Sequence, residues 1–182
     1  MPTDTRRYAI EVAGIKVGTM TATQQPQAHE TVTYTLVSDV NVNFLVYKLK
    51  IYYKVTNVFR RGQLQVSVVE SRTNRGNFLS RTEWKKDHYD IVAEQYKHSY
   101  RTTQTTPITF AVTNLYFSEP VGQVTAFAEY FGDQFALMPG KKPGTYRAHR
   151  DGRDDEYQYE QGRLVKIIKK NSIKNFIIKP VP

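Results

Sequence analysis

The sequence predicts an all-β protein with one short helix, folded as a curved antiparallel half-barrel or open barrel. Apolar and polar residues alternate over most of the chain, turns that contain Gly recur between these segments, and Tyr, Thr and Val are abundant. Alternation puts one row of side chains on each face of a strand, and β-branched and aromatic residues favour strands. A length of 182 residues suits one β-barrel or sandwich, so we expect a single β-rich domain over residues 1–182.

The sheet is predicted to be built on residues 31–60. Apolar residues occupy even positions in the first half of this stretch and odd positions in the second half. The phase changes near Leu45, where no Gly, Pro or Asp is present to form a tight turn. One inserted residue makes a β-bulge, which bends a strand. We therefore predict a single long strand bent near Leu45, and a hairpin at this point is the alternative, because strands of this length are uncommon.

Hairpins are predicted on either side of this stretch. Ala13-Gly14 and Arg61-Gly62 supply tight reversals, and Gly18 indicates a bulge or a close approach of another backbone. From Gly14 to Arg101 we expect an up-and-down meander. A first strand is predicted before it, at residues 8–12. The other strands of the meander cover residues 15–23, 63–72, a segment with Phe78 and Trp84, and 89–101, and its turns cover 24–27, 74–77 and 86–88.

The short helix is predicted at residues 108–117. Phe110, Leu115 and Phe117 do not alternate cleanly, and Pro120 would end a helix. The segments predicted after it are strands at 124–131 and 134–138, a mobile loop at 139–144, turns at 151–153 and 161–162, and strands at 164–170 and 173–178.

Composition limits the classes of function. The absence of Cys excludes disulfides, Cys-ligated zinc and thiol catalysis. No window approaches the roughly 20 apolar residues of a membrane helix, and residues 1–5 do not read as a signal peptide. The net charge is +9, and residues 141–182 hold 11 Lys and Arg against 5 Asp and Glu. Such a charge attracts anionic partners or simply keeps a basic surface solvated.

Motifs of known active sites are missing, so we expect a protein that is not an enzyme, with no catalytic residues and no cofactor. The sequence has no Gly-x-Ser-x-Gly, no His-Glu-x-x-His, no phosphate-binding loop and no dinucleotide fingerprint. The four histidines are scattered without a ligand spacing. The acidic residues within 151–156 do not match an EF-hand, so we interpret them as a solvated turn and predict no metal site.

An apolar groove is expected on the concave face, because a short helix cannot fill a large curved sheet. We predict that the groove lies between the long strand and the segment around residues 115–117, with Trp84 at its mouth. The predicted ligand-binding residues are Phe44, Tyr47, Leu49, Ile51, Tyr53, Trp84, Leu115 and Phe117. The alternative is a barrel whose interior is filled by its own side chains and loops.

Four lysines near the C-terminus are predicted to attract an anionic headgroup or membrane surface: Lys166, Lys169, Lys170 and Lys174. Aromatic and basic residues also interleave at residues 52–54 and 96–101, as in proteins that bind single-stranded nucleic acid. Tyr is an ordinary strand residue, however, and the chain has 13 of them. Nucleic acid is therefore the weaker alternative as a partner.

Several short segments, in order along the chain, carry a family resemblance. They are Tyr8-x-Ile10-x-Val12 with Gly14-Ile15-x-Val17-Gly18, Ser38, Gly62-x-Leu64-x-x-Ser67, Asn74-Arg75-Gly76, Leu115-Tyr116-Phe117-x-Glu119-Pro120, Glu129-Tyr130-Phe131-Gly132 and Tyr157-x-Tyr159-x-x-Gly162-x-Leu164. In these segments the chain resembles exported bacterial envelope proteins of unknown function, whose curved sheet is similar to that of the lipoprotein carriers LolA and LolB. The resemblance implies this fold, a periplasmic or otherwise extracytoplasmic location after removal of a signal peptide, and a lipid or other apolar ligand. It implies no catalytic residues.

We therefore predict a non-enzymatic periplasmic or envelope protein that binds an apolar or lipid-like ligand on the concave face of a half-barrel. The first alternative is a protein-interaction or scaffold module with a filled core, which acts through exposed strands. The second is a single-stranded nucleic-acid binder. The sequence identifies no protein partner.

Overall fold

The computed structural model describes residues 2–44, 47–170 and 175–182. In this part of the chain, 14 strands form one antiparallel sheet, accompanied by a short 3-10 helix, which confirms the predicted all-β class. The elements are β1 (Asp4–Val12), β2 (Ile15–Gln27), β3 (Thr31–Phe44), β4 (Tyr47–Arg60), β5 (Gln63–Thr73), β6 (Gly76–Trp84), β7 (Tyr89–Gln95), β8 (His98–Gln104), η1 (Val112–Tyr116), β9 (Thr125–Ala128), β10 (Asp133–Pro139), β11 (Thr145–Arg150), β12 (Arg153–Glu160), β13 (Arg163–Lys169) and β14 (Phe176–Val181).

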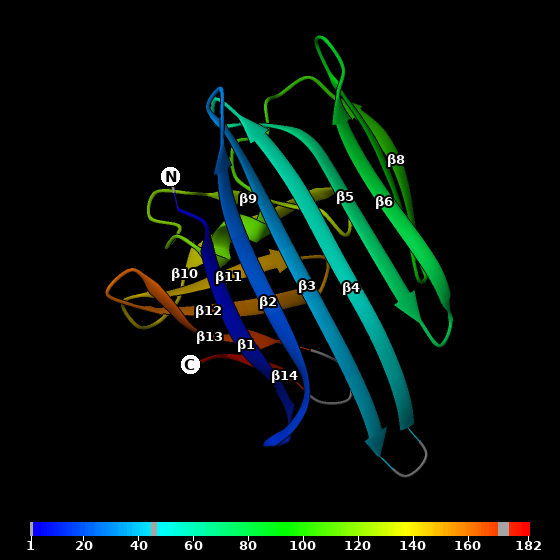
Figure 1. Ribbon diagram of the computed structural model, residues 1–182, viewed down its shortest axis with the longest axis vertical. Helices are drawn as coiled ribbons and strands as arrows, with labels where there is room; N and C mark the ends of the chain where they lie inside the picture. The colour runs from blue at the N-terminus through cyan, green and yellow to red at the C-terminus, as the bar shows by residue number, and fades with distance from the viewer. Residues whose placement is uncertain (1, 45–46, 171–174) are drawn as a thin grey trace.

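Two meanders, β1 to β8 and β9 to β14, make up the sheet. They are joined because β1 pairs with β14, which places Ile10 opposite Ile178. Figure 1 shows the long strands β1–β5 in front and β10–β13 crossing behind them, so that the sheet curls round on itself. The turn between β9 and β10 packs against the other meander, where the Ser80 hydroxyl donates to the Tyr130 carbonyl (3.2 Å) and the His98 ring to the Phe131 carbonyl (2.9 Å).

The predicted bent strand over residues 31–60 is wrong, and the hairpin alternative is correct. β3 and β4 pair along their whole length, from Thr31 opposite Arg60 to Phe44 opposite Tyr47. In this register every even residue of β3 lies opposite an odd residue of β4. The apolar residues at even positions of β3 and those at odd positions of β4 therefore lie on one face of a hairpin. The change of phase thus marks a reversal of the chain and not a bulge.

The predicted strand over 124–131 is shorter in the structure, where β9 ends at Ala128. Two boundaries in the first meander also differ from the prediction. The expected turn at residues 24–27 belongs to β2, where Pro26 lies opposite Val32 beyond the last β1 partner, so no strand on that side needs its missing N–H. The chain reverses instead at His29, which has a φ of 58°. The expected single strand over 89–101 is the hairpin of β7 and β8, which reverses at Lys97 with a φ of 57°.

The predicted glycine positions are confirmed. The reversals Ala13-Gly14 and Arg61-Gly62 both have positive φ at the two residues, as two-residue hairpins require. At Gly18 a Cβ atom would overlap the Asp39 carbonyl oxygen of β3, so only glycine allows this close approach.

The segment after β8 becomes buried at Ile108 and contains the predicted helix in shortened form, at Val112–Tyr116. The residues before it make extended contacts, because Leu64 N–H donates to the Ile108 carbonyl (2.8 Å) and Phe127 N–H to the Phe110 carbonyl (2.9 Å). These bonds replace the helix expected from residue 108. Among the described residues, no helix has the length and apolar character needed to span a membrane.

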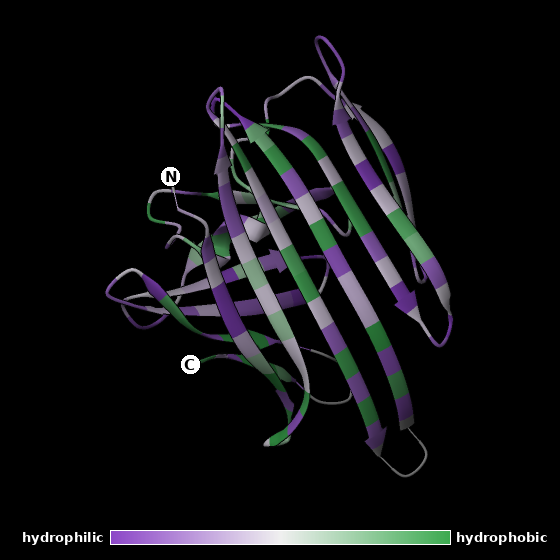
Figure 2. Cartoon of the chain, in the orientation of Figure 1, coloured by the Kyte–Doolittle hydropathy of each residue, from purple (hydrophilic) through white to green (hydrophobic). Residues whose placement is uncertain are grey.

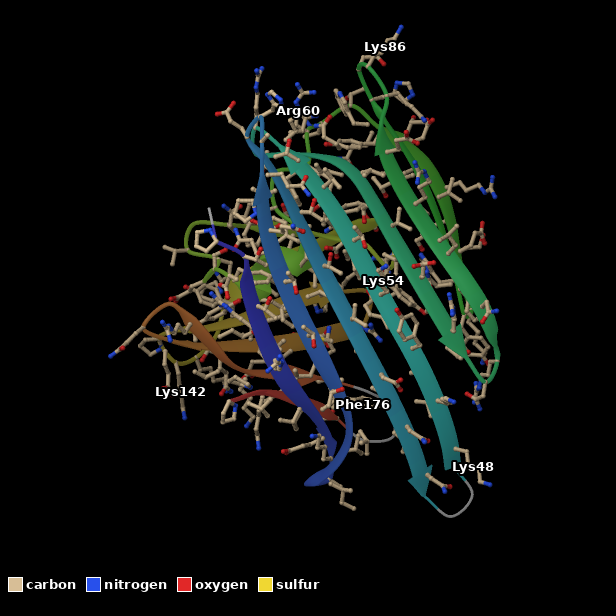
Figure 3. The ribbon with its side chains drawn as sticks, viewed as in Figure 1. Lys48, Lys54, Arg60, Lys86, Lys142 and Phe176 are labelled. Atoms are coloured by element: carbon tan, nitrogen blue, oxygen red, sulfur yellow. The ribbon has the colours of Figure 1, made fainter. Side chains whose placement is uncertain are left out.

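The two rims of the curled sheet differ. We call the rim with the β5–β6, β7–β8, β9–β10 and β11–β12 turns the open rim, and the rim with the β4–β5 and β6–β7 turns the closed rim. At the closed rim, Ile108 packs with Phe59, Leu64 and Tyr89 in a small core cluster. Figure 3 shows Lys48 and Phe176 toward the open rim, and Arg60 and Lys86 at the closed one.

Candidate functional site: a half-open cavity with apolar walls and charged groups

The interior contains a half-open cavity of about 590 Å³. It is lined by Ile10, Met20, Leu36, Ser38, Val40, Leu49, Ile51, Tyr53, Val55, Ser71, Thr73, Arg75, Tyr96, Val112, Tyr116, Ala128, Glu129, Tyr130, Phe131, Phe135, Arg153, Asp155, Lys169, Phe176 and Ile178. Several of these residues end strands or form turns at the open rim, including Arg75, Phe131 and Arg153. A volume of this size is within the range of small-molecule binding sites.

Alternation along β3 and β4 builds the apolar wall. Leu49, Ile51 and Tyr53 occupy odd positions and line the cavity. Lys50 and Lys54 occupy even positions and lie on the opposite face of the sheet. Figure 2 shows this as alternating hydrophobic and hydrophilic bands along the long strands. The wall therefore follows directly from the period of two in the sequence.

An ion pair lies inside the cavity. The Lys169 ammonium of β13 is 3.3 Å from the Asp155 carboxylate of β12, and the Asp155 side chain is only 1% exposed. The backbone N–H of Lys170 also donates to Asp155, at 3.2 Å. Burial is the largest single effect and would lower the pKa of Lys169, but the combined effects of the Asp155 carboxylate and of Tyr116 raise it. Lys169 is therefore a charged group that faces the cavity.

Arg153 and Arg75 line the same cavity near its exposed margin. The Arg153 guanidinium lies 5.2 Å from the centre of the Phe131 ring, and Arg75 donates to the Tyr96 hydroxyl at 2.6 Å. In the described residues, neither arginine has a carboxylate within ion-pairing distance, whereas Arg150, on the same Phe131 ring, pairs with Asp133 at 3.2 Å. The cavity thus carries two cations without an acidic partner.

A buried carboxyl group completes the polar part of the lining. Glu129 is 3% exposed and accepts hydrogen bonds from the Asn57 amide (2.7 Å) and the Thr113 N–H (3.0 Å). Burial raises the pKa of Glu129, although these hydrogen bonds act in the opposite direction. Glu129 connects the sheet to η1, because Asn57 belongs to β4 and also donates to the Thr113 hydroxyl at 2.8 Å.

Hydrogen bonds to its carbonyls fix the last turn of η1 inside the barrel. The Tyr116 carbonyl accepts from Arg6 at 2.7 Å, and the Leu115 carbonyl accepts from the Tyr159 hydroxyl at 2.6 Å. These bonds satisfy carbonyl groups that a helix end leaves without partners. As a result the Tyr116 ring forms part of the cavity wall.

The structure brings together only some of the predicted ligand-binding residues. Leu49, Ile51 and Tyr53 share the cavity wall, whereas the side chains of Phe44 and Tyr47 lie outside the described residues. The other three predicted positions do not line this cavity. Leu115 is fully buried in the core, Phe117 packs on Tyr34 with ring centres 5.6 Å apart, and Trp84 packs on Tyr89 with ring centres 4.7 Å apart at the closed rim. Trp84 is therefore not at the mouth.

The three predicted anionic-surface lysines that the structure describes do not form one surface. Lys169 faces the cavity, Lys170 pairs with Asp154 at 3.2 Å, and Lys166 is half-buried on β13. Lys174 lies outside the described residues. The solvated turn predicted at residues 151–156 is also incorrect for Asp155, which is buried within β12. No group of three or more His, Asp or Glu in the described part of the chain is arranged to hold a metal ion.

The acidic residues of the lining, Asp155 and Glu129, were not predicted, although the sequence contains a signal for one of them. Asp155 has the same parity as Tyr157 and Tyr159, so alternation alone places it on the inner face. Glu129 directly follows the buried apolar residues Ala126, Phe127 and Ala128. An acidic residue is costly to bury at such a position without partners. Neither position belongs to a known motif.

Comparison with known proteins agrees with the fold. Residues 8–181 match the family described as a domain of unknown function (DUF6134). No curated protein sequence is significantly similar to the chain. The fold is similar to the crystal structure of a beta-barrel-like protein of domain of unknown function DUF1849 from Brucella abortus, with a TM-score of 0.58 and 11% identity over 99% of this chain and 95% of that chain. At this identity the similarity concerns the fold alone.

Proposed function

The chain belongs to the DUF6134 family, whose function is unknown, and we propose that it is a non-enzymatic protein that binds one lipid-like ligand in its cavity. The observation that carries this proposal is the half-open space of about 590 Å³ with an aliphatic wall from β1 to β4. Protein interiors are normally packed as densely as organic crystals, and exposed apolar surface is unfavourable in water. An apolar ligand chain that covers this wall would relieve that cost.

The residues around the cavity favour binding over catalysis. Among the described residues that line it there is no His, and the Ser71 hydroxyl donates to the Gln95 amide oxygen at 2.7 Å. A hydroxyl without a neighbouring base is a poor nucleophile. The lining thus offers shape, apolar surface and fixed charges.

An extracytoplasmic location is part of the proposal. Its support is the resemblance of the sequence to exported envelope proteins with a LolA/LolB-like sheet. Fractionation of cells that express the gene from its natural start would test this part. Recovery in the cytoplasmic fraction would contradict it and leave the cavity proposal unaffected.

The cavity proposal is tested by mass spectrometry of an organic extract of the purified native protein. We expect a lipid or fatty acid in a stoichiometric amount. Ile51→Trp fills the cavity and should remove the bound molecule, whereas Val58→Trp, on the other face of β4, should retain it. A clean extract, together with no binding of added lipids, would contradict the proposal and favour a filled interaction module.

A further inference from the structure

We propose that the ligand of this cavity is an anionic amphiphile, whose oxyanion headgroup is held by Arg153 at the open rim and whose chain lies against the aliphatic wall. This inference rests on the proposed function and specifies its substrate class. It depends on the distribution of charge around the cavity and not on the size of the cavity.

The cavity lining has more basic than acidic side chains, and not all of the basic ones have an acidic partner. Three cations, Arg75, Arg153 and Lys169, face the cavity with two acidic residues, Glu129 and Asp155. Asp155 is engaged by Lys169 at 3.3 Å. Glu129 is engaged by Asn57 and Thr113. The two arginines therefore have no acidic partner in the described lining, so the cavity has an excess of positive charge at its margin.

Arg153 is placed to receive a ligand. It begins β12 on the same face of the strand as Asp155, two residues further on. The Phe131 ring supports its guanidinium at 5.2 Å, and the same ring also supports Arg150 at 4.8 Å. Arg150 is neutralised by Asp133 (3.2 Å) and Asp151 (3.4 Å), whereas Arg153 is not. A guanidinium that packs beside a ring and has no carboxylate partner keeps N–H groups available for a carboxylate or phosphate.

The apolar wall begins where the cations end. Leu49 and Ile51 belong to the end of β4 nearest the open rim, where Ile51 pairs with Thr73, next to the turn that holds Arg75. The cavity continues past Tyr53 and Val55 to Leu36 and Met20. A cationic margin followed by an aliphatic interior is complementary to a molecule with one anionic end and one alkyl chain. It is less suited to a neutral or a cationic amphiphile.

Four probes with the same dodecyl chain, each below its micelle concentration, test the proposal by calorimetric titration of the full chain. They are dodecanoate, dodecyl phosphate, dodecanol and dodecyltrimethylammonium. We expect at least one of the two anions to bind about 10-fold or more tightly than dodecanol, as charge-assisted hydrogen bonds to a guanidinium imply. The stronger of the two anions shows whether a carboxylate or a phosphate is preferred.

Arg153→Gln should reduce the preference for the anion to less than about 3-fold while dodecanol binds as before, since an exposed polar replacement leaves the wall intact. The matched control is Arg163→Gln, an exposed arginine at the β12–β13 turn that does not line the cavity, which removes the same charge and should keep the preference. Equal binding of dodecanol and both anions, or tighter binding of the ammonium, would overturn the headgroup inference and leave the proposed function in place. Failure of all four probes to bind would overturn both.

Discussion

The Lys169 ammonium lies 3.3 Å from the Asp155 carboxylate, inside the barrel and not on its surface. The two residues come from neighbouring strands, β13 and β12, and both face the cavity. Each partner of this ion pair balances the charge of the other in a largely buried position, so the two residues depend on each other. This dependence makes the pair a sensitive point for stability.

Lys169→Met should lower the free energy of unfolding by about 2–3 kcal/mol. Removing one partner of a buried ion pair typically costs about 3–5 kcal/mol. We expect a loss at or below the lower end of this range, because the Lys169 side chain is 31% exposed and Asp155 still accepts a hydrogen bond from the Lys170 N–H. Chemical denaturation provides the measurement. The control is Lys179→Met, which removes the exposed Lys179–Glu11 pair (3.2 Å) and should cost about 0–1 kcal/mol. Equal losses would show that the Asp155 pair is no more important than a surface pair.

The sequence predicted much of the fold because alternation and turn glycines are local signals. Gly18, Ala13-Gly14 and Arg61-Gly62 all have the roles that their residue types indicate. The error at residues 31–60 has a physical reason: a bulge and a two-residue reversal both change the phase of alternation by one residue. Only the register of β3 against β4 distinguishes them, and register is a long-range property.

The candidate site was less predictable, because it depends on which strands meet after the sheet curls. Alternation correctly placed Leu49, Ile51 and Tyr53 on one face. It gave no information that Trp84 would pack at the closed rim, or that Tyr116 would line the cavity while Leu115 is in the core. These placements depend on residues 108–116, which pack in the interior and have no repeating pattern.

Glu129→Gln should make the protein more stable at neutral pH and nearly unchanged at acidic pH. Burial raises the pKa of Glu129 above its ordinary value of about 4.5 in the folded state. The stabilisation from this group is therefore complete below that ordinary value and is lost as the pH rises through the folded pKa. Gln keeps an oxygen for the Asn57 and Thr113 donors but does not ionise.

Urea unfolding of both proteins from pH 4 to pH 8 measures this effect. The stability difference between Glu129→Gln and the natural protein should grow as the pH rises from about 4.5, following the linkage relation. Glu160→Gln, at the exposed end of β12, controls for the change in net charge. A difference that does not change over this range would show that Glu129 is not held in its protonated form by folding.

Gly18→Ala should destabilise the protein by about 2–4 kcal/mol, because the added Cβ would overlap the Asp39 carbonyl oxygen and the backbone of β3 cannot move without loss of pairing. Thermal unfolding provides the measurement. Gly122→Ala is the control: its Cβ meets nothing within 4 Å, and the cost is limited to about 1–2 kcal/mol for a φ of +76°. A smaller loss at Gly18 than at Gly122 would mean that β2 and β3 separate easily at this point.

Trp84 emission should not change when a ligand enters the cavity, because its ring packs on Tyr89 at the closed rim, with ring centres 4.7 Å apart. The double variant Trp84→Phe and Tyr53→Trp moves the only indole of the chain to the cavity wall, where Tyr53 lies 6.3 Å from the Tyr130 ring. Addition of dodecanoate should then shift the emission to the blue, since the alkyl chain replaces water around the indole. A shift in the natural protein, with none in the double variant, would place the ligand at the closed rim and contradict the cavity assignment.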